Sequence, residues 1–168
     1  MSAQPIPRSV LLVGAALLPL IAASSSAATK SANFQVLATI VSDCSVVSAS
    51  NIDFGSVGVM TNDLDTTSTV TLVCTPGTAY TLSLDPGTGT GSTITDRRMA
   101  SAGGGSLKYQ LFRNPARTQN WGNTPGTDTQ GGTGTGSNVP YTIYARLPAQ
   151  ATPEVGSYTS TVTATVTY

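Results

Sequence analysis

Histidine is absent from this 168-residue sequence, and charged residues of either sign are scarce. Eight basic and eight acidic residues together make up 10% of the composition. Without histidine, no Ser-His-Asp triad can form, and two cysteines alone make a poor zinc site. The few acidic residues are scattered, mostly in turns, so no spacing marks the carboxylate pair of a glycosidase. The sequence therefore argues against an enzyme and against a bound metal.

Basic residues form no patch, and this excludes a second group of functions. A nucleic-acid-binding protein needs clustered lysine and arginine to neutralise phosphates. No glycine-rich phosphate-binding loop is present either. We therefore expect no nucleic-acid partner, no cofactor and no small-molecule substrate.

Long apolar runs are also missing, with one short exception near the N-terminus. Arg8 precedes a run of small and apolar residues from Val10 to Ala23, followed by the small residues of SSSAAT. A membrane-spanning helix needs about 20 apolar residues, so the run is short for a span. A basic start, a short apolar stretch and a small-residue exit are typical of a secretory signal peptide. We predict a signal peptide over residues 1–28 with cleavage after Ala28. Cleavage after Ala27 and a retained membrane anchor are the alternatives.

Cysteine is rare, with only Cys44 and Cys74 in the chain. In an exported protein such a pair predicts a disulfide, because the compartment is oxidising. Two free buried thiols are the alternative. Removing residues 1–28 takes away one basic residue, Arg8, and leaves a formal charge of −1 on the mature chain.

What the sequence does contain is period-two alternation rich in Thr, Val and Tyr. This pattern is typical of half-buried β-strands, and Gly/Pro-rich turns separate its segments. Several short strands in one domain of this length predict an antiparallel sandwich. The expected strands cover residues 34–41, 67–74, 80–84, 107–112, 141–147 and 158–168. The Gly/Thr-rich stretch over residues 122–138 predicts a long flexible surface loop.

The two ends of this pattern are unusual for a self-contained sandwich. An apolar strand starts directly after the predicted signal peptide, and another reaches the last residue. Sandwiches normally blunt or hide such edges. The remaining strands are about one fewer than an immunoglobulin domain has. The first strand either leaves its own domain or pairs within it, and the pattern alone leaves both open.

Other candidate residues have mainly structural interpretations. Asp96, Arg97 and Arg98 are expected in a local ion pair or a solvated turn. A lone tryptophan is a weak signal of sugar binding. The aromatics that we expect in or near the core are Tyr109, Phe112, Trp121 and Tyr144.

The order of these segments resembles the spore coat protein U-like family, which includes pilin subunits of archaic chaperone–usher pili. The resemblance spans the whole mature chain. It rests on both cysteines, the segment LKYQLFRN that leads to Arg117 and Trp121, and the last strand led by GSY. The segments that carry it are ANFQVLATIVSDCSV at 32–46, NIDFGSV at 51–57, VTLVCTPGTAYTLSL at 70–84, DRRM at 96–99, LKYQLFRNPARTQNWG at 107–122 and VGSYTSTVTATVTY at 155–168.

The resemblance implies an all-β fold, an incomplete immunoglobulin-like antiparallel β-sandwich with an N-terminal donor strand. Residues 29–41 would be that strand and residues 42–168 the pilin domain. The disulfide would join the start of the first strand to the second. The groove left by the missing strand would bind a periplasmic chaperone and then, at an outer-membrane usher, the donor strand of a neighbouring subunit. The partners would be pilin subunits, in a homo- or heteropolymer.

Within the expected donor strand, alternate side chains share one face. We predict that Phe34, Val36, Ala38 and Ile40 form the inserting row. The opposite row, Gln35, Leu37, Thr39 and Val41, is more mixed, and a register slip of one residue would exchange the two.

The expected function is that of a structural subunit of a surface pilus, secreted through the periplasm and supporting adhesion and biofilm formation. The alternatives are a tip adhesin or other binding protein, and a secreted coat protein that assembles without an usher.

Overall fold

The computed structural model describes residues 26–168, and the predicted signal peptide lies almost entirely outside this range. The described chain consists of a segment that ends at Ala38 and a body from Thr39 to Tyr168. All eight elements of the described residues are β-strands in the body, and none of them is a helix. No helix in this part of the chain could therefore cross a membrane.

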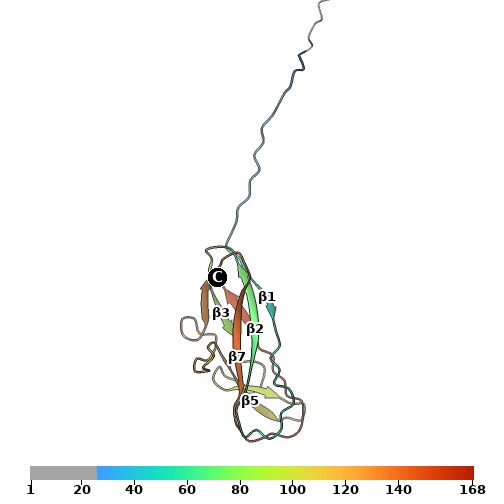
Figure 1. The fold of residues 1–168 in the computed structure, drawn as a ribbon, viewed down its shortest axis with the longest axis vertical. Helices are drawn as coiled ribbons and strands as arrows, with labels where there is room; N and C mark the ends of the chain where they lie inside the picture. The colour runs from blue at the N-terminus through green and yellow to red at the C-terminus, as the bar shows by residue number, and fades with distance from the viewer. Residues whose placement is uncertain (1–25) are drawn as a thin grey trace, which may run out of the picture. The chain divides into compact units, whose positions relative to one another are not determined.

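The body contains two antiparallel sheets (Figure 1). The larger one has the strand order β1-β2-β7-β5-β4 and the smaller one the order β6-β3-β8. The strands are β1 (Cys44–Ala49), β2 (Leu64–Cys74), β3 (Ala79–Leu84), β4 (Arg97–Ala100), β5 (Ser106–Phe112), β6 (Gln130–Thr133), β7 (Val139–Leu147) and β8 (Ala164–Thr167).

Period-two alternation explains how these strands enclose a core. In β2, Val70, Leu72 and Cys74 are buried, whereas the intervening Thr71 and Val73 are partly exposed. The inward rows of the two sheets meet in one cluster, because each sheet can bury only its apolar face. Its largest fully buried apolar members are Trp121, Leu72, Leu82, Leu84, Leu111, Leu147 and Val70. The all-β antiparallel sandwich predicted from the pattern is confirmed.

Four expectations need correction. Residues 44–49 were not among the strands expected from alternation, but they form β1, the first strand of the body. Strand β4 occupies the stretch assigned to a turn, because Arg97–Ala100 pair with Tyr109–Ser106 across a hairpin. Strand β8 is shorter than predicted and covers only about the last third of the expected strand over residues 158–168. Residues 158–163 form only one isolated bridge, Ala100 to Thr159.

The fourth correction concerns residues 122–138, predicted as a long flexible loop. They contain β6, which pairs with β3. Thr133 lies opposite Ala79 at one end of the ladder, and Gln130 lies opposite Leu82 at the other. Before it, Asp128 closes a turn, because its carboxylate accepts a hydrogen bond from the Thr124 amide at 2.7 Å. Glycine and threonine composition resembles that of a linker, but here backbone pairing with β3 decides the structure.

Candidate functional site: an apolar groove beside the last strand

The final stretch of the chain presents alternate side chains to the interior. Tyr158, Ser160, Val162, Ala164 and Val166 are half-buried, whereas the threonines between them are exposed. This alternation begins before β8 and shows that residues 158–167 keep an extended conformation throughout.

The backbone of this stretch is bonded on one side. The odd-numbered residues face β3 and β4: Thr159 exchanges two hydrogen bonds with Ala100, and the Thr163 carbonyl accepts one from the Asp85 amide. Backbone groups of neighbouring residues in a strand point to opposite sides. The even-numbered groups therefore point away from β3. Within residues 26–168, the amides of Tyr158, Ser160 and Val162 have no hydrogen-bond acceptor.

The opposite wall is the segment that follows β1. Strand β1 pairs with β2 on one side only, with a bulge between Val46 and Ser48. Beyond it, Ile52 and Phe54 pack partly against the core, and Val59 is 79% exposed. The two walls belong to different sheets, and no strand of the described chain lies between them.

Two adjoining hollows lie between these walls, with volumes of about 740 and 480 Å3. Ile52, Phe54, Met99 and Tyr158 line both, so the hollows form one continuous groove. Core side chains form the floor. They are Met60, Leu107 and Leu147 in the larger hollow, and Val70, Leu84, Tyr109, Leu111 and Ile143 in the smaller. A groove that opens onto the core is the expected consequence of a missing sandwich strand.

Beyond the smaller hollow, which reaches Ala49 and Ala164, β1 lies close to β8 and the disulfide holds this end of the body together. Cys44, the first residue of β1, is bonded to Cys74, the last of β2, so the predicted pairing is confirmed. Next to it, the Tyr168 hydroxyl donates to the Asp43 carboxylate at 2.9 Å. The Thr75 hydroxyl contacts the Val41 carbonyl at 3.1 Å. The first and last residues of the body therefore meet at this end.

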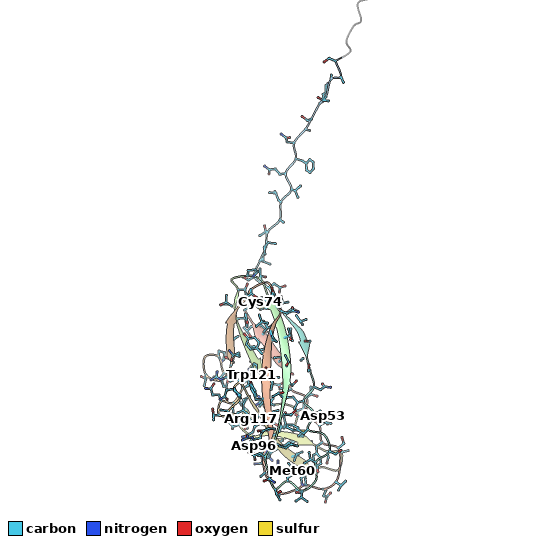
Figure 2. All side chains as sticks on the ribbon, viewed as in Figure 1. Asp53, Met60, Cys74, Asp96, Arg117 and Trp121 are labelled. Carbon is cyan, nitrogen blue, oxygen red and sulfur yellow. A yellow bond between two sulfur atoms is a disulfide. The ribbon has the colours of Figure 1, made fainter. Side chains whose placement is uncertain are left out.

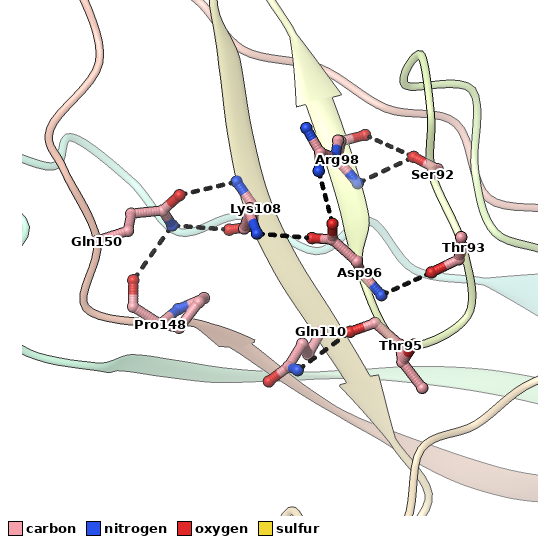
Figure 3. Close-up of polar contacts among 9 residues, drawn as sticks. All are labelled: Ser92, Thr93, Thr95, Asp96, Arg98, Lys108, Gln110, Pro148 and Gln150. Carbon is pink, nitrogen blue, oxygen red and sulfur yellow. Dashed lines mark hydrogen bonds and ion pairs between the residues drawn. The ribbon is translucent and has the colours of Figure 1, made fainter.

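The other end is held by the segment after β7, where the Gln150 side chain substitutes for a strand partner (Figure 3). Its amide accepts a hydrogen bond from the Lys108 backbone N–H and donates to the Lys108 carbonyl, both at 3.0 Å. The backbone N–H of Gln150 donates to the Met60 carbonyl. The backbone N–H of Met60 in turn donates to the Thr152 hydroxyl. These bonds join the two walls of the larger hollow. Figure 2 shows Met60 near this end of the body and Cys74 near the other.

A buried arginine that sequence reasoning missed supports the floor. Arg97 is fully buried, and its guanidinium donates to the carbonyls of Leu84, Asp85, Ile94 and Trp121 at 2.7–3.3 Å. Burial lowers the pKa of Arg97 from its usual value. Nothing in the doublet Arg97-Arg98 distinguishes the buried member, because only the pairing of β4 with β5 decides which side chain points inward.

The two residues that flank Arg97, Asp96 and Arg98, form the predicted ion pair. Asp96 pairs with Arg98 at 2.6 Å and with Lys108 at 3.3 Å (Figure 3). The hydrogen bond from Arg98 is the main cause of a lowered Asp96 pKa. Tyr109 in the groove floor donates to the Ser160 hydroxyl at 3.0 Å, and burial raises the pKa of Tyr109.

The expected aromatic core is confirmed for Tyr109, Phe112 and Trp121, which are at most 5% exposed. Tyr144 is half-buried beneath the Arg117 guanidinium, 5.8 Å from its ring centre. Trp121 is 1% exposed, and its indole donates to the Leu82 carbonyl at 3.1 Å. A sugar-binding role for Trp121 is therefore wrong. No group of three or more metal-ligating side chains occurs within residues 26–168.

The segment predicted to insert into a neighbour is extended and has no assigned strand. A strand needs partners for its backbone groups. Within residues 26–168, the only hydrogen bond to this segment's backbone goes from the Thr75 hydroxyl to the Val41 carbonyl. Phe34, Val36 and Ile40 are 81–86% exposed, but Leu37 in the opposite row is equally exposed at 84%. The choice of inserting row therefore remains a prediction.

The fold is thus an immunoglobulin-like antiparallel β-sandwich that lacks one strand between its first and last strands. The model of the Spore Coat Protein U domain matches residues 30–165, and the chain belongs to this family. Protein U of Myxococcus xanthus is 30% identical over 158 residues, which cover 86% of this chain and 88% of that protein. The family predicted from the resemblance is confirmed.

A solved structure shares the fold. A chain in the crystal structure of the CsuC–CsuE chaperone–tip adhesion subunit pre-assembly complex, from archaic chaperone–usher Csu pili of Acinetobacter baumannii, is similar with a TM-score of 0.59. The identity is 22%, and the match covers 77% of this chain. This chain spans 41% of the length of that solved chain.

Proposed function

We propose that this protein is a structural subunit of a surface pilus that polymerises by donor-strand complementation. The single observation that carries the proposal is the groove, where core side chains line a continuous hollow beside the unbonded edge of the last strand. Adding a strand to such an edge supplies main-chain hydrogen bonds for affinity and pockets for specificity. Residues 29–41 of a neighbouring subunit would fill the groove.

The inserting row has enough apolar surface to make such a bond strong. Burying a large apolar side chain contributes about 1.5–3 kcal/mol, so Phe34, Val36 and Ile40 together would supply about 5–9 kcal/mol. Their exposure in the single chain means that this free energy is available for assembly. An exposed apolar strand next to an open core also aggregates readily. A partner that covers both before assembly is therefore part of the proposal.

That partner would be a periplasmic chaperone, and an outer-membrane usher would catalyse the exchange. The fold shared with a chain of a chaperone–subunit complex supports this pathway. The protein would be exported by its predicted signal peptide and displayed on the cell surface, where the pilus would support adhesion and biofilm formation. The proposal assigns no catalytic role to any residue.

A second candidate, a secreted coat protein that assembles without an usher, is suggested by the name of the family, the Spore Coat Protein U domain. Genes for a chaperone and an usher beside the gene for this chain would favour the pilus. Unaided assembly of the exported chain onto the cell surface would favour the coat.

The test is deletion of residues 29–41 from the full chain. We expect the exported variant to bind its chaperone but to form no heat-resistant polymer on a denaturing gel. As a matched control, the two polar residues of the outward row are replaced (Gln35→Ser and Thr39→Ser), which should leave the polymer ladder unchanged. Polymers formed normally by the deletion variant would disprove donor-strand complementation.

A further inference from the structure

Resting on the proposed function, the geometry points to a specific partner and register for the groove. We propose that the groove accepts residues 29–41 of a second copy of this chain, antiparallel to the extended stretch that leads into β8, with Ala38 opposite Tyr158. Three independent features of the body support this arrangement: where the chain enters it, which groups of the last strand are unbonded, and how side-chain size varies along the groove.

The direction follows from where the chain enters the body. Residues Val41 and Asp43 lie at the disulfide end of the groove, beside the C-terminal Tyr168. In a polymer, each subunit also inserts its own N-terminal segment into a neighbour. That segment leaves the body at the disulfide end, so the body of the incoming subunit cannot lie there. The incoming segment must therefore end near Val155, at the opposite end, so that its own body lies beyond it. Because the last strand runs from Val155 toward Tyr168, the incoming strand runs antiparallel to it.

The unbonded backbone groups decide which residues of the wall oppose the row that inserts. Even-numbered residues of the last strand point their side chains inward and their backbone groups toward the groove. Directly opposed residues of an antiparallel pair project side chains to the same face. Inward even-numbered residues of the wall must therefore oppose the row that inserts, which the sequence predicts to be Phe34, Val36, Ala38 and Ile40.

The register follows from side-chain size. Tyr158, which lines both hollows, is the bulkiest inward residue of the wall, and Ala38 is the smallest of the row. Setting them opposite places Ile40 against Gly156, where the larger hollow lies, Val36 against Ser160 and Phe34 against Val162. The same register opposes residues 32–41 to residues 164–155, the part of the last stretch that lines the two hollows.

Neighbouring registers fit less well. A shift of two residues one way sets Ile40 against Tyr158, and Ala38 against the small Ser160. A shift of two residues the other way sets Val36 against Tyr158, and leaves the small Ala38 against Gly156 at the larger hollow. Both combine overpacking at one site with a void at another, and each is destabilising. Residues 31–41 and 155–168 contain no charged residue. The charged residues of the lining, Asp53 and Glu154, lie outside residues 155–168, and Lys30 would lie opposite Val166, so this register brings no like charges together.

The test uses cysteines on the solvent-facing rows, where packing is undisturbed. The proposed register sets Gln35 opposite Thr161, and odd-numbered pairs are non-hydrogen-bonded, with Cα atoms about 4.5 Å apart, within disulfide range. One tagged copy of the full chain carries Gln35→Cys and another carries Thr161→Cys, and both are exported together. We expect a disulfide-linked dimer that reduction separates and whose linked peptides contain both positions.

The matched control pairs Gln35→Cys with Thr163→Cys. In the proposed register these residues are diagonal neighbours about 7–8 Å apart, so the dimer yield should fall to about a tenth or less. Wild-type chain checks that the Cys44–Cys74 bond does not exchange. A dominant 35–163 link would overturn the register. Polymers that depend on residues 29–41 but give no link between copies would overturn the inference and leave the proposed function standing. Polymers that form without residues 29–41 would contradict both the inference and the proposed function.

Discussion

At the scale of single residues, the most consequential side chain is Arg97. Its guanidinium satisfies four carbonyls around the groove floor without a carboxylate partner. Buried carbonyls that lose their donors remain desolvated, and this penalty exceeds the net gain of an ordinary hydrogen bond. Leu84 and Trp121 accept two of these bonds, so the arginine joins the smaller sheet to the segment that follows β5.

We expect Arg97→Met to lower the free energy of unfolding by about 3 kcal/mol or more. Urea denaturation followed by Trp121 fluorescence would measure the loss. Arg98→Met is the matched control, since Arg98 is about a third exposed and pairs only with a surface carboxylate. It should cost less than about 1 kcal/mol. Equal losses in the two variants would show that Arg97 has no special structural role.

At the scale of elements, the outer face of the larger sheet carries a cross-strand ion pair. Asp65 on β2 lies directly opposite Arg146 on β7, and two hydrogen bonds of 2.7 and 2.9 Å join them. Arg117 adds a contact at 3.2 Å. The hydrogen bond from Arg146 lowers the pKa of Asp65. This pair contributes to the pairing of β2 with β7 beyond the backbone ladder.

A lowered carboxyl pKa stabilises the fold above the unfolded-state pKa, which is about 3.9 for aspartate. That contribution disappears as the pH falls through the folded-state pKa. We expect Asp65→Asn to be less stable than wild type at pH 7 by up to about 1 kcal/mol, since the pair is about a third exposed. As the pH is lowered from 7 into the acid range, the difference between the two urea midpoints should shrink steadily. A difference that does not shrink would mean that the substitution acts through packing.

Element boundaries show where the pattern was informative. The cores of β2, β3, β5 and β7 follow from alternation, because each has one buried and one solvent-facing row. The short strands β4 and β6 do not, because the burial of Arg97 and the Gly131-Gly132 pair carry no alternation signal. Both exist because a neighbouring strand provides backbone partners, and this information is not local.

At the scale of the whole molecule, the proposed function makes the groove and the N-terminal segment of a neighbouring copy complementary binding surfaces. The single chain leaves an open groove and an exposed apolar row, and assembly would satisfy both. The prediction at this scale concerns which row inserts. Phe34→Asp and Val36→Asp should each reduce polymer by at least about tenfold, because a charge would be buried in an apolar groove.

Gln35→Asp is the matched control, with the same charge placed on the row that faces solvent. It should assemble like wild type, as read from polymer ladders and from electron microscopy of cell-surface fibres. Equal defects in all three variants would mean that the inserting face has been assigned to the wrong row.

The sequence by itself determined the cores of β2, β3, β5 and β7, the disulfide pair and the apolar segment before Cys44. Local alternation or the scarcity of one residue type is enough to predict each of them, without knowing which residues are neighbours in space. The groove was decided only by the tertiary structure. It arises because the walls after β1 and before β8, far apart in the chain, lie on either side of one missing strand. The same holds for Arg97, whose burial depends on carbonyls that three different segments bring together.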